Sequence, residues 1–281
     1  MQNKIIVVLL LFITCKLHAA TLNNTLKVGT LIYNPPYEIS LLNKHYSYGF
    51  NIEIMQRLCK LIQYQCTMVP MRFDELLTAL NENKVDAIIV GISLEPIHMG
   101  RYAFSNPYFI GNAVFLTRSA SQFSSLDHKT VGVVKNTLVP MKYFFDLIFI
   151  DDAYQKQEDV IHFKFFKNLP DLLDGLNGEQ VDAIFLDAGA AQYWVDESAG
   201  AYRVTGPIVS LHHGMMVMSL KKNQRLIDLI NSTLVEMENN GELLAIYRKY
   251  WGAIYPYAKA TGVLLPLGGR SYQFMTPFIK R

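Results

Sequence analysis

The sequence is poor in the features that mark several common classes of protein. Only 18% of its 281 residues are charged, the formal net charge is +2 with histidine neutral, and the lysines and arginines are scattered. A nucleic-acid partner is therefore not expected, since phosphate binding needs a concentrated basic surface. The chain also lacks a glycine-rich phosphate loop, a G-x-S-x-G turn and a C-x-x-C pair, so nothing in it indicates a nucleotide-binding enzyme, a serine hydrolase or a thiol oxidoreductase.

Histidine is sparse as well, with seven residues and one adjacent pair, His212-His213. Neighbouring residues of a strand point to opposite faces, so this pair cannot readily chelate one ion. Asp151-Asp152 follows an aromatic segment and is interpreted as a solvated turn rather than a catalytic carboxylate pair. We expect no metal site, no cofactor and no catalytic residue.

The first 20 residues have the pattern of an export signal. Lys4 precedes an apolar run from Ile5 to Ile13, which is too short to span a bilayer, and small residues follow at Ala19 and Ala20. We expect cleavage after Ala19 or Ala20 and a periplasmic location. The alternatives are a buried N-terminal strand, or lipidation of a cysteine at position 15, for which the preceding threonine is unfavourable.

Removal of the signal leaves two cysteines, Cys59 and Cys66, at the expected passage from a helix to a strand. An exported protein meets an oxidising environment, so these cysteines are expected to form a disulfide. Two unpaired thiols in the core would be the better interpretation only for a cytosolic protein.

What the chain does contain is an internal repeat. Residues 76–88 read LLTALNENKVDAI and residues 172–184 read LLDGLNGEQVDAI, with eight identical positions. Each copy is an amphipathic helix that leads into a β-branched strand with an aspartate at its entry. Helix–strand units rich in Leu and Ile can match by chance, but the shared Val-Asp-Ala-Ile favours a true repeat. Two such units indicate two α/β lobes with a cleft between them.

Hydrophobic periodicity extends this division to the rest of the chain, of which 51% is hydrophobic. The chain is expected to leave the first lobe near residues 108–112 and to return near 209–213. Strands are predicted over residues 26–31, 64–71, 85–92, 113–117, 130–135, 160–166, 202–205 and 215–220, and helices over 49–63, 73–84, 96–102, 141–149, 188–197 and 223–251, the last interrupted near 239–241.

Several motifs together resemble the periplasmic amino-acid-binding proteins of ABC importers, in the family 3 class that includes the lysine/arginine/ornithine- and glutamine-binding proteins. The likeness covers roughly residues 26–252. It is carried by Leu26–Thr30, Pro35–Glu38, Gly49–Glu53, Cys59–Cys66, Val85–Ser93, Phe104–Phe109, Val181–Asp187 and Glu236–Gly252.

The resemblance implies a type II periplasmic-binding-protein fold of class α/β, in which each of two lobes is a β-sheet flanked by helices and two crossings form the hinge. Lobe 1 is expected to comprise residues 21–108 and 213–252, and lobe 2 residues 109–212. Residues 253–281 extend past the usual end of the family, with packing on lobe 1 or a partner contact as the possible roles.

The resemblance implies that the protein captures a small polar solute, with an amino acid as the first candidate. The protein is expected to be a monomer and to deliver the solute to the membrane permease of an ABC importer. Two alternatives stay open. The fold also resembles exported cyclohexadienyl dehydratases, which act on prephenate or arogenate and need a general acid in the cleft, a role open to Glu95 or His98. A ligand-sensing subunit of a membrane signalling system is the other.

Carried over position by position, the resemblance places Phe50 against the ligand side chain and Asp187 on the ligand ammonium. Ser93 and the backbone at Gly91 bind from lobe 1, and the helix start after Ser93 directs N–H groups at the ligand carboxylate. The complete predicted ligand-binding set is Tyr33, Asn34, Phe50, Gly91, Ser93, His98, Thr137 and Asp187.

Several positions depart from the family pattern. His98 stands where an arginine usually binds the carboxylate, with Arg101 one turn further, and Glu95 replaces a threonine. Leu31 replaces a common aspartate, Asn34 replaces an aromatic residue, and residues 135–138 replace the usual anion loop of lobe 2. Two accounts remain. In the first, the ligand is an amino acid whose carboxylate is held by helix N–H groups, Ser93 and protonated His98. In the second, the ligand lacks a free α-carboxylate or is cationic, and it meets Glu95, Asp187 and the aromatic faces of Phe50, Tyr33 and Tyr37.

Overall fold

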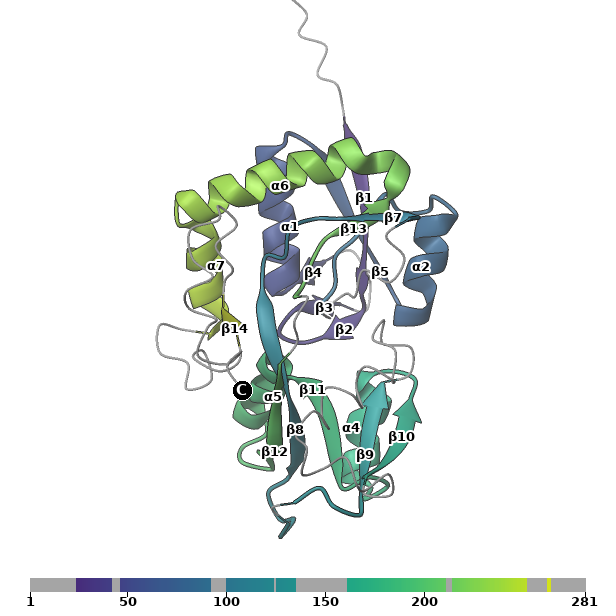
Figure 1. Cartoon of the computed structure of the whole chain (residues 1–281), viewed down its shortest axis with the longest axis vertical. Coiled ribbons are helices and arrows are strands. Elements are labelled where there is room, and N and C mark those ends of the chain that lie inside the picture. Colours follow the sequence, from purple (N-terminus) through teal and green to yellow (C-terminus); the bar gives the residue numbers. More distant parts are fainter. Residues whose placement is uncertain are drawn as a thin grey trace, which may run out of the picture.

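A computed structural model describes residues 24–41, 46–91, 100–123, 125–134, 161–210, 214–251 and 262–263. It has two lobes, each built on its own β-sheet with helices packed against it (Figure 1). The predicted two-lobed α/β fold is confirmed. The predicted signal segment, residues 92–99 and residues 135–160 lie outside the described part of the chain.

The sheet of lobe 1 has the strand order β5-β1-β6-β13-β7. Strands β1, β5 and β6 run parallel, whereas β13 is antiparallel to β6 and β7. A small antiparallel sheet, β2-β3-β4, follows β1. The elements of this lobe are β1 (Thr25–Leu31), β2 (Tyr33–Asn34), β3 (Glu38–Ser40), β4 (Ser47–Tyr48), α1 (Phe50–Leu61), β5 (Gln65–Met71), α2 (Phe73–Asn81), β6 (Ala87–Ile88), β7 (Tyr102–Phe104), β13 (Met218–Leu220), the 3-10 turn η1 (Lys221–Asn223), α6 (Gln224–Asn239) and α7 (Glu242–Trp251).

The sheet of lobe 2 has the order β10-β9-β11-β8-β12. Strands β9, β10 and β11 are parallel, and β8 is antiparallel to both β11 and β12. Its elements are β8 (Ile110–Arg118), β9 (Lys129–Val134), β10 (Ile161–Phe166), α4 (Leu169–Asn177), β11 (Ala183–Asp187), α5 (Ala188–Glu197) and β12 (Tyr202–Ser210).

The predicted repeat is confirmed in three dimensions. The two copies form α2 with β6 and α4 with β11. Asp86 Oδ2 accepts a hydrogen bond from the backbone N–H of Lys27, and Asp182 Oδ2 accepts one from that of Thr130, both at 2.8 Å. Each aspartate thus ties the entry of its strand to the neighbouring parallel strand.

Strand β8 runs from lobe 1 into lobe 2, and the end of β12 pairs with the first part of β8 (Figure 1). At the lobe 1 end of this hinge, Phe109 bridges to Met215, and the Ser105 hydroxyl accepts a hydrogen bond from the N–H of Val217 at 2.9 Å. A further short strand, β14 (Gly262–Val263), pairs with the start of β8. The exact lobe boundaries stay a prediction.

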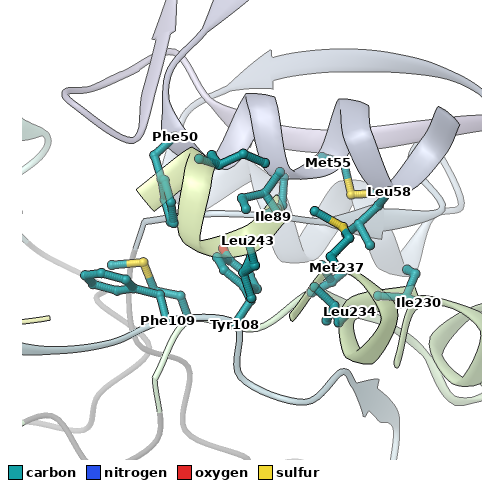
Figure 2. Packing of buried hydrophobic residues seen from close by; sticks show 14 of the residues in the cluster. Phe50, Met55, Leu58, Ile89, Tyr108, Phe109, Ile230, Leu234, Met237 and Leu243 are labelled. Atoms are coloured by element: carbon teal, nitrogen blue, oxygen red, sulfur yellow. The ribbon is translucent and has the colours of Figure 1, made fainter. Parts of the chain in front are cut away.

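The core of lobe 1 forms between α1, α6 and α7 (Figure 2). Apolar residues recur at helical spacing along α1, so that one face of the helix is buried. Cys59 on this buried face forms a disulfide with Cys66 of β5, with a Cα–Cα distance of 6.0 Å. The predicted disulfide is therefore confirmed. Tyr102, expected at the end of a helix, instead begins β7.

Candidate functional site

The carboxyl ends of the parallel strands in both sheets define the candidate site. In lobe 1, β1 ends at Leu31 and leads into the β2–β3 hairpin, and the segment after β6 reaches Gly91. In lobe 2, β11 ends at Asp187. Open α/β sheets bind ligands at this edge of the sheet. The two edges meet at Tyr37, in the hairpin turn, whose hydroxyl donates a hydrogen bond to Asp187 Oδ1.

Asp187 combines a structural role with a free acceptor. It is the N-cap of α5, and its Oδ1 also accepts a hydrogen bond from the backbone N–H of Gly189 at 2.8 Å. Its Oδ2 is buried and has no hydrogen-bond partner among the described residues. Burial raises the pKa of Asp187 to about 6, against the opposing effect of hydrogen bonds from the Tyr37 hydroxyl and from the backbone N–H groups of Gly189 and Ala190. This carboxylate is therefore suited to meeting a cationic group between the lobes.

Tyr37 lies inside an aromatic cluster at the junction of the lobes. Its ring is 0% exposed, and its centroid lies 5.7 Å from that of Trp251 and 6.2 Å from that of Phe109. Two glycines allow this packing. A Cβ added at Gly91 would lie 2.4 Å from Tyr37 Cγ, and one at Gly189 would lie 2.4 Å from the Tyr37 hydroxyl. The glycines thus let each lobe approach the tyrosine closely.

The next residue in the chain, Glu38, is 0% exposed and lies in a buried network of polar side chains. Glu38 Oε1 accepts a hydrogen bond from Asn51 Nδ2 at 2.5 Å, and Oε2 accepts one from Asn34 Nδ2 at 3.1 Å. The Tyr108 hydroxyl donates to Asn51 Oδ1 at 2.9 Å. Burial raises the pKa of Glu38 to about 8, although hydrogen bonds from Asn51, Asn34 and the Gly91 backbone favour the ionised form.

Comparison with known proteins places this geometry in a family. Residues 26–253 match the family model of bacterial extracellular solute-binding proteins, family 3. The chain belongs to this family. A crystal structure of an arginine third transport system periplasmic binding protein from Legionella pneumophila shares 30% identity, with a TM-score of 0.72 over 81% of this chain and 99% of that one.

Other relatives of this family carry related names. An arginine-binding periplasmic protein of Mannheimia haemolytica is 29% identical over 78% of this chain and 87% of its own length. An ancestral arginine-binding protein bound to arginine is 25% identical, with a TM-score of 0.69 over 82% of this chain and 99% of its own. The chain is thus a solute-binding protein of type II fold rather than an enzyme, as the sequence predicted. Among the described residues, no helix is long and apolar enough to cross a bilayer.

Of the predicted ligand-binding residues, the structure brings Asn34, Gly91 and Asp187 around the hairpin turn of this solute-binding protein. Asn34 Nδ2 lies 3.5 Å from the carbonyl oxygen of Gly91. Tyr33 is 37% exposed, and its ring centroid lies 6.4 Å from that of Trp194 in lobe 2. Ser93, His98 and Thr137 lie outside the described residues, as does Glu95.

Phe50, which the family resemblance places against the ligand side chain, is buried in lobe 1. It is 0% exposed and packs edge-on against Trp251, with ring centroids 4.6 Å apart. In this arrangement it forms part of the aromatic core of lobe 1, so its contact with a ligand side chain stays a proposal. Within the described chain, no group of three or more histidine, cysteine, aspartate or glutamate side chains is arranged to hold a metal ion.

Sequence analysis gave no role at the site to Glu38 or Gly189. It considered Tyr37 only as an aromatic face for a cationic ligand and did not foresee its hydrogen bond to Asp187. A glutamate after a Pro-Pro-Tyr turn carries no local sign of burial. The glycines at positions 91 and 189 were the available signal of close packing, because a residue without a Cβ lets another group approach the backbone more closely than any other residue does. That signal becomes specific only when the facing aromatic ring is known.

Proposed function

We propose that this solute-binding protein captures a free amino acid between its lobes, with its ammonium group on Asp187, and delivers it to the permease of an ABC importer. The observation that carries the proposal is the buried, unpartnered Oδ2 of Asp187 at the junction of the lobes. A buried carboxylate oxygen without a donor is costly, and a ligand ammonium supplies the missing donor together with the opposite charge.

The class of amino acid is proposed from the relatives. Proteins named for arginine recur among them, and others are named for L-cystine and histidine. An ancestral arginine-binding protein has also been solved with glutamine bound. Arginine and related basic amino acids are therefore the first candidates, and neutral polar amino acids the second. Ser93, His98 and Thr137 are proposed to complete the site around the ligand carboxylate.

The cellular setting is part of the same proposal. The segment up to Ala20 is proposed to direct export to the periplasm and to be cleaved, after which the protein acts as a monomer. The Cys59–Cys66 disulfide supports an oxidising compartment. Delivery requires docking of the ligand-bound form on a membrane permease.

The test is a thermal-shift screen of the exported chain followed by calorimetry. The panel contains the twenty amino acids, ornithine, agmatine, polyamines, dicarboxylates and prephenate. A ligand present at 100 times its dissociation constant stabilises the folded state by about 2.7 kcal/mol. A response to one class of amino acids, with agmatine much weaker than arginine, supports the proposal. Equal binding of agmatine, or binding of prephenate alone, contradicts it.

The matched variants are Asp187→Asn and Asp196→Asn. Asparagine keeps the N-cap of α5 but removes the charge, so the ammonium is left buried against a neutral amide. We expect affinity to fall at least about thirty-fold, which corresponds to roughly 2 kcal/mol. Asp196 lies on the same helix but is exposed and bonds to Gln192, so its variant should bind as the wild type does.

A further inference from the structure

Glu38 links several segments of lobe 1 at the candidate site, because its carboxyl oxygens accept hydrogen bonds from them. The structure gives it hydrogen-bond donors on three sides: the amide of Asn51, the amide of Asn34 and the backbone of Gly91. A carboxyl group can accept at both oxygens, even when one of them carries a proton, whereas an amide in its place accepts at one and only donates at the other. The position therefore demands an acceptor and not merely a polar side chain of this size.

This demand fixes the orientation of Asn34. Its Nδ2 faces two acceptors, Glu38 Oε2 at 3.1 Å and the Gly91 carbonyl oxygen at 3.5 Å. The reverse orientation would place Oδ1 against the Gly91 carbonyl oxygen, which can only accept, so this contact selects one assignment of the amide whether or not Glu38 carries a proton. Oδ1 of Asn34 is consequently turned away from Glu38, and none of the described residues donates a hydrogen bond to it.

The anchor of Glu38 is rigid. Asn51, at the start of α1, is fully buried and holds Oε1, while its own Oδ1 accepts from the buried Tyr108 hydroxyl. Tyr108 lies next to the hinge residue Phe109, and its N–H donates to the carbonyl of Met215 at 3.0 Å. The side chain of Asn34, held through Glu38 by these buried hydrogen bonds, is already ordered, so it loses little conformational entropy when a ligand binds.

We propose that Glu38 is a positioning residue that makes Asn34 present its side-chain oxygen to the ligand, so that the site selects a solute with a hydrogen-bond donor at that point. This inference rests on the proposed function in one respect, because it takes the ligand to bind beside Asn34. In this account Glu38 does not contact the solute, but it determines that the solute must offer a hydrogen-bond donor to Asn34.

The experiment reverses the hydrogen bond and then restores it. In Glu38→Gln, Oε1 of the glutamine still accepts from Asn51, but its Nε2 faces Asn34 and forces that amide to turn. Asn34 then offers a donor, and affinity for the amino acid found in the screen should fall at least tenfold. In the double variant Glu38→Gln/Asn34→Asp, the new aspartate accepts from the glutamine Nε2 and again presents an oxygen. Its affinity should return to within about threefold of the wild type.

A purely structural role predicts another pattern. In that case affinity follows thermal stability, and the double variant, which has two altered buried residues, binds no better than Glu38→Gln. Either of these results would overturn the proposal. Tyr102→Phe is the control, since it removes a hydroxyl of lobe 1 that donates to Asn81 outside this network, and its affinity should change less than threefold.

A ligand-free measurement separates this inference from the proposed function. The side-chain amide protons of Asn34, followed by NMR in the ligand-free protein, should exchange slowly in the wild type and faster by at least tenfold in Glu38→Gln. If no amino acid binds but the exchange rates differ in this way, the proposed function fails and the positioning role stands. Unchanged exchange overturns the positioning role, whatever the protein binds.

Discussion

The hydroxyl of Tyr37, in the hairpin turn of lobe 1, donates a hydrogen bond to Asp187 Oδ1, at the end of the central strand β11 of lobe 2. One carboxylate therefore serves both lobes. Its Oδ1 is used by Tyr37 and by the N-terminus of α5, while its Oδ2 is left without a partner among the described residues. The contact between the lobes and the proposed binding of a ligand ammonium thus involve the same side chain.

The first prediction concerns pH and Asp187. Burial raises the pKa of this carboxyl to about 6, so in the ligand-free protein it becomes protonated as the pH falls through that value. An ammonium ligand binds the ionised form, and the apparent dissociation constant should rise about tenfold between pH 7 and pH 5. Calorimetry across this range measures the change. Asp187→Asn should show weaker binding without this dependence, and an equally steep profile in that variant would contradict the assignment.

The second prediction concerns the hydroxyl of Tyr37. Its hydrogen bond lowers the pKa of Asp187 against the stronger effect of burial, so Tyr37→Phe should move the midpoint of the binding profile above pH 6. The variant should therefore bind more weakly at pH 7 and recover at pH 8. The control is Tyr202→Phe, which removes a hydroxyl bonded to Asn177 elsewhere in lobe 2. A midpoint that stays in place, or moves below pH 6, would show that Tyr37 does not tune this carboxylate.

Much of the fold could be predicted because the relevant signals are local. The periodicity of residues 188–197 and 223–251, with the break near 239–241, gives α5, α6 and α7 nearly to the residue. The repeat of residues 76–88 at 172–184 was visible in the sequence, and its two aspartates make equivalent contacts with the backbone of the neighbouring strand. The small β2-β3-β4 sheet was not predicted, since its strands have two or three residues and show no measurable alternation.

The site was predictable only in part. Asp187 was selected because it ends a strand of the repeat and matches the family pattern, and its contact with a ligand stays a prediction. Its hydrogen bond to Tyr37 spans 150 residues and leaves no mark on either local sequence. Burial of Glu38 is equally invisible, because its donors come from Asn34, Asn51 and Gly91, on separate elements. Phe50 was hard to interpret for another reason. An aromatic residue at the start of a helix can line a ligand site or belong to the core, and its burial against Trp251 of α7 depends on a segment distant in the sequence.

The third prediction concerns stability and Glu38. Its pKa is raised to about 8 in the folded state, so between the unfolded value of 4.5 and pH 8 the folded protein retains a proton that the unfolded chain has lost. The free energy of unfolding should therefore decrease as the pH rises, by about 2 kcal/mol between pH 6.5 and pH 8 from this residue alone. Urea titrations without ligand measure it. The Glu38→Gln curve should be flatter by that amount, and parallel curves would contradict the prediction.

The last prediction uses Gly189 to test whether the approach of the lobes at Tyr37 matters for binding. A Cβ at this position would lie 2.4 Å from the Tyr37 hydroxyl and 3.1 Å from Trp251 Nε1. Both rings are held in the aromatic cluster, so Gly189→Ala must separate Tyr37 from Asp187, and we expect at least tenfold weaker binding. Gly100→Ala is the control, because none of the described residues comes within 4 Å of its added Cβ.

A double-mutant cycle makes the cause specific. In the Tyr37→Phe background the hydroxyl oxygen that the added methyl group would strike is gone, so the further effect of Gly189→Ala on affinity should shrink to less than threefold. Equal effects in the two backgrounds would mean that the methyl group acts on Trp251 or on α5 itself. In that case the Tyr37–Asp187 contact would be a consequence of lobe packing, and the carboxylate would bind its ligand independently of the tyrosine.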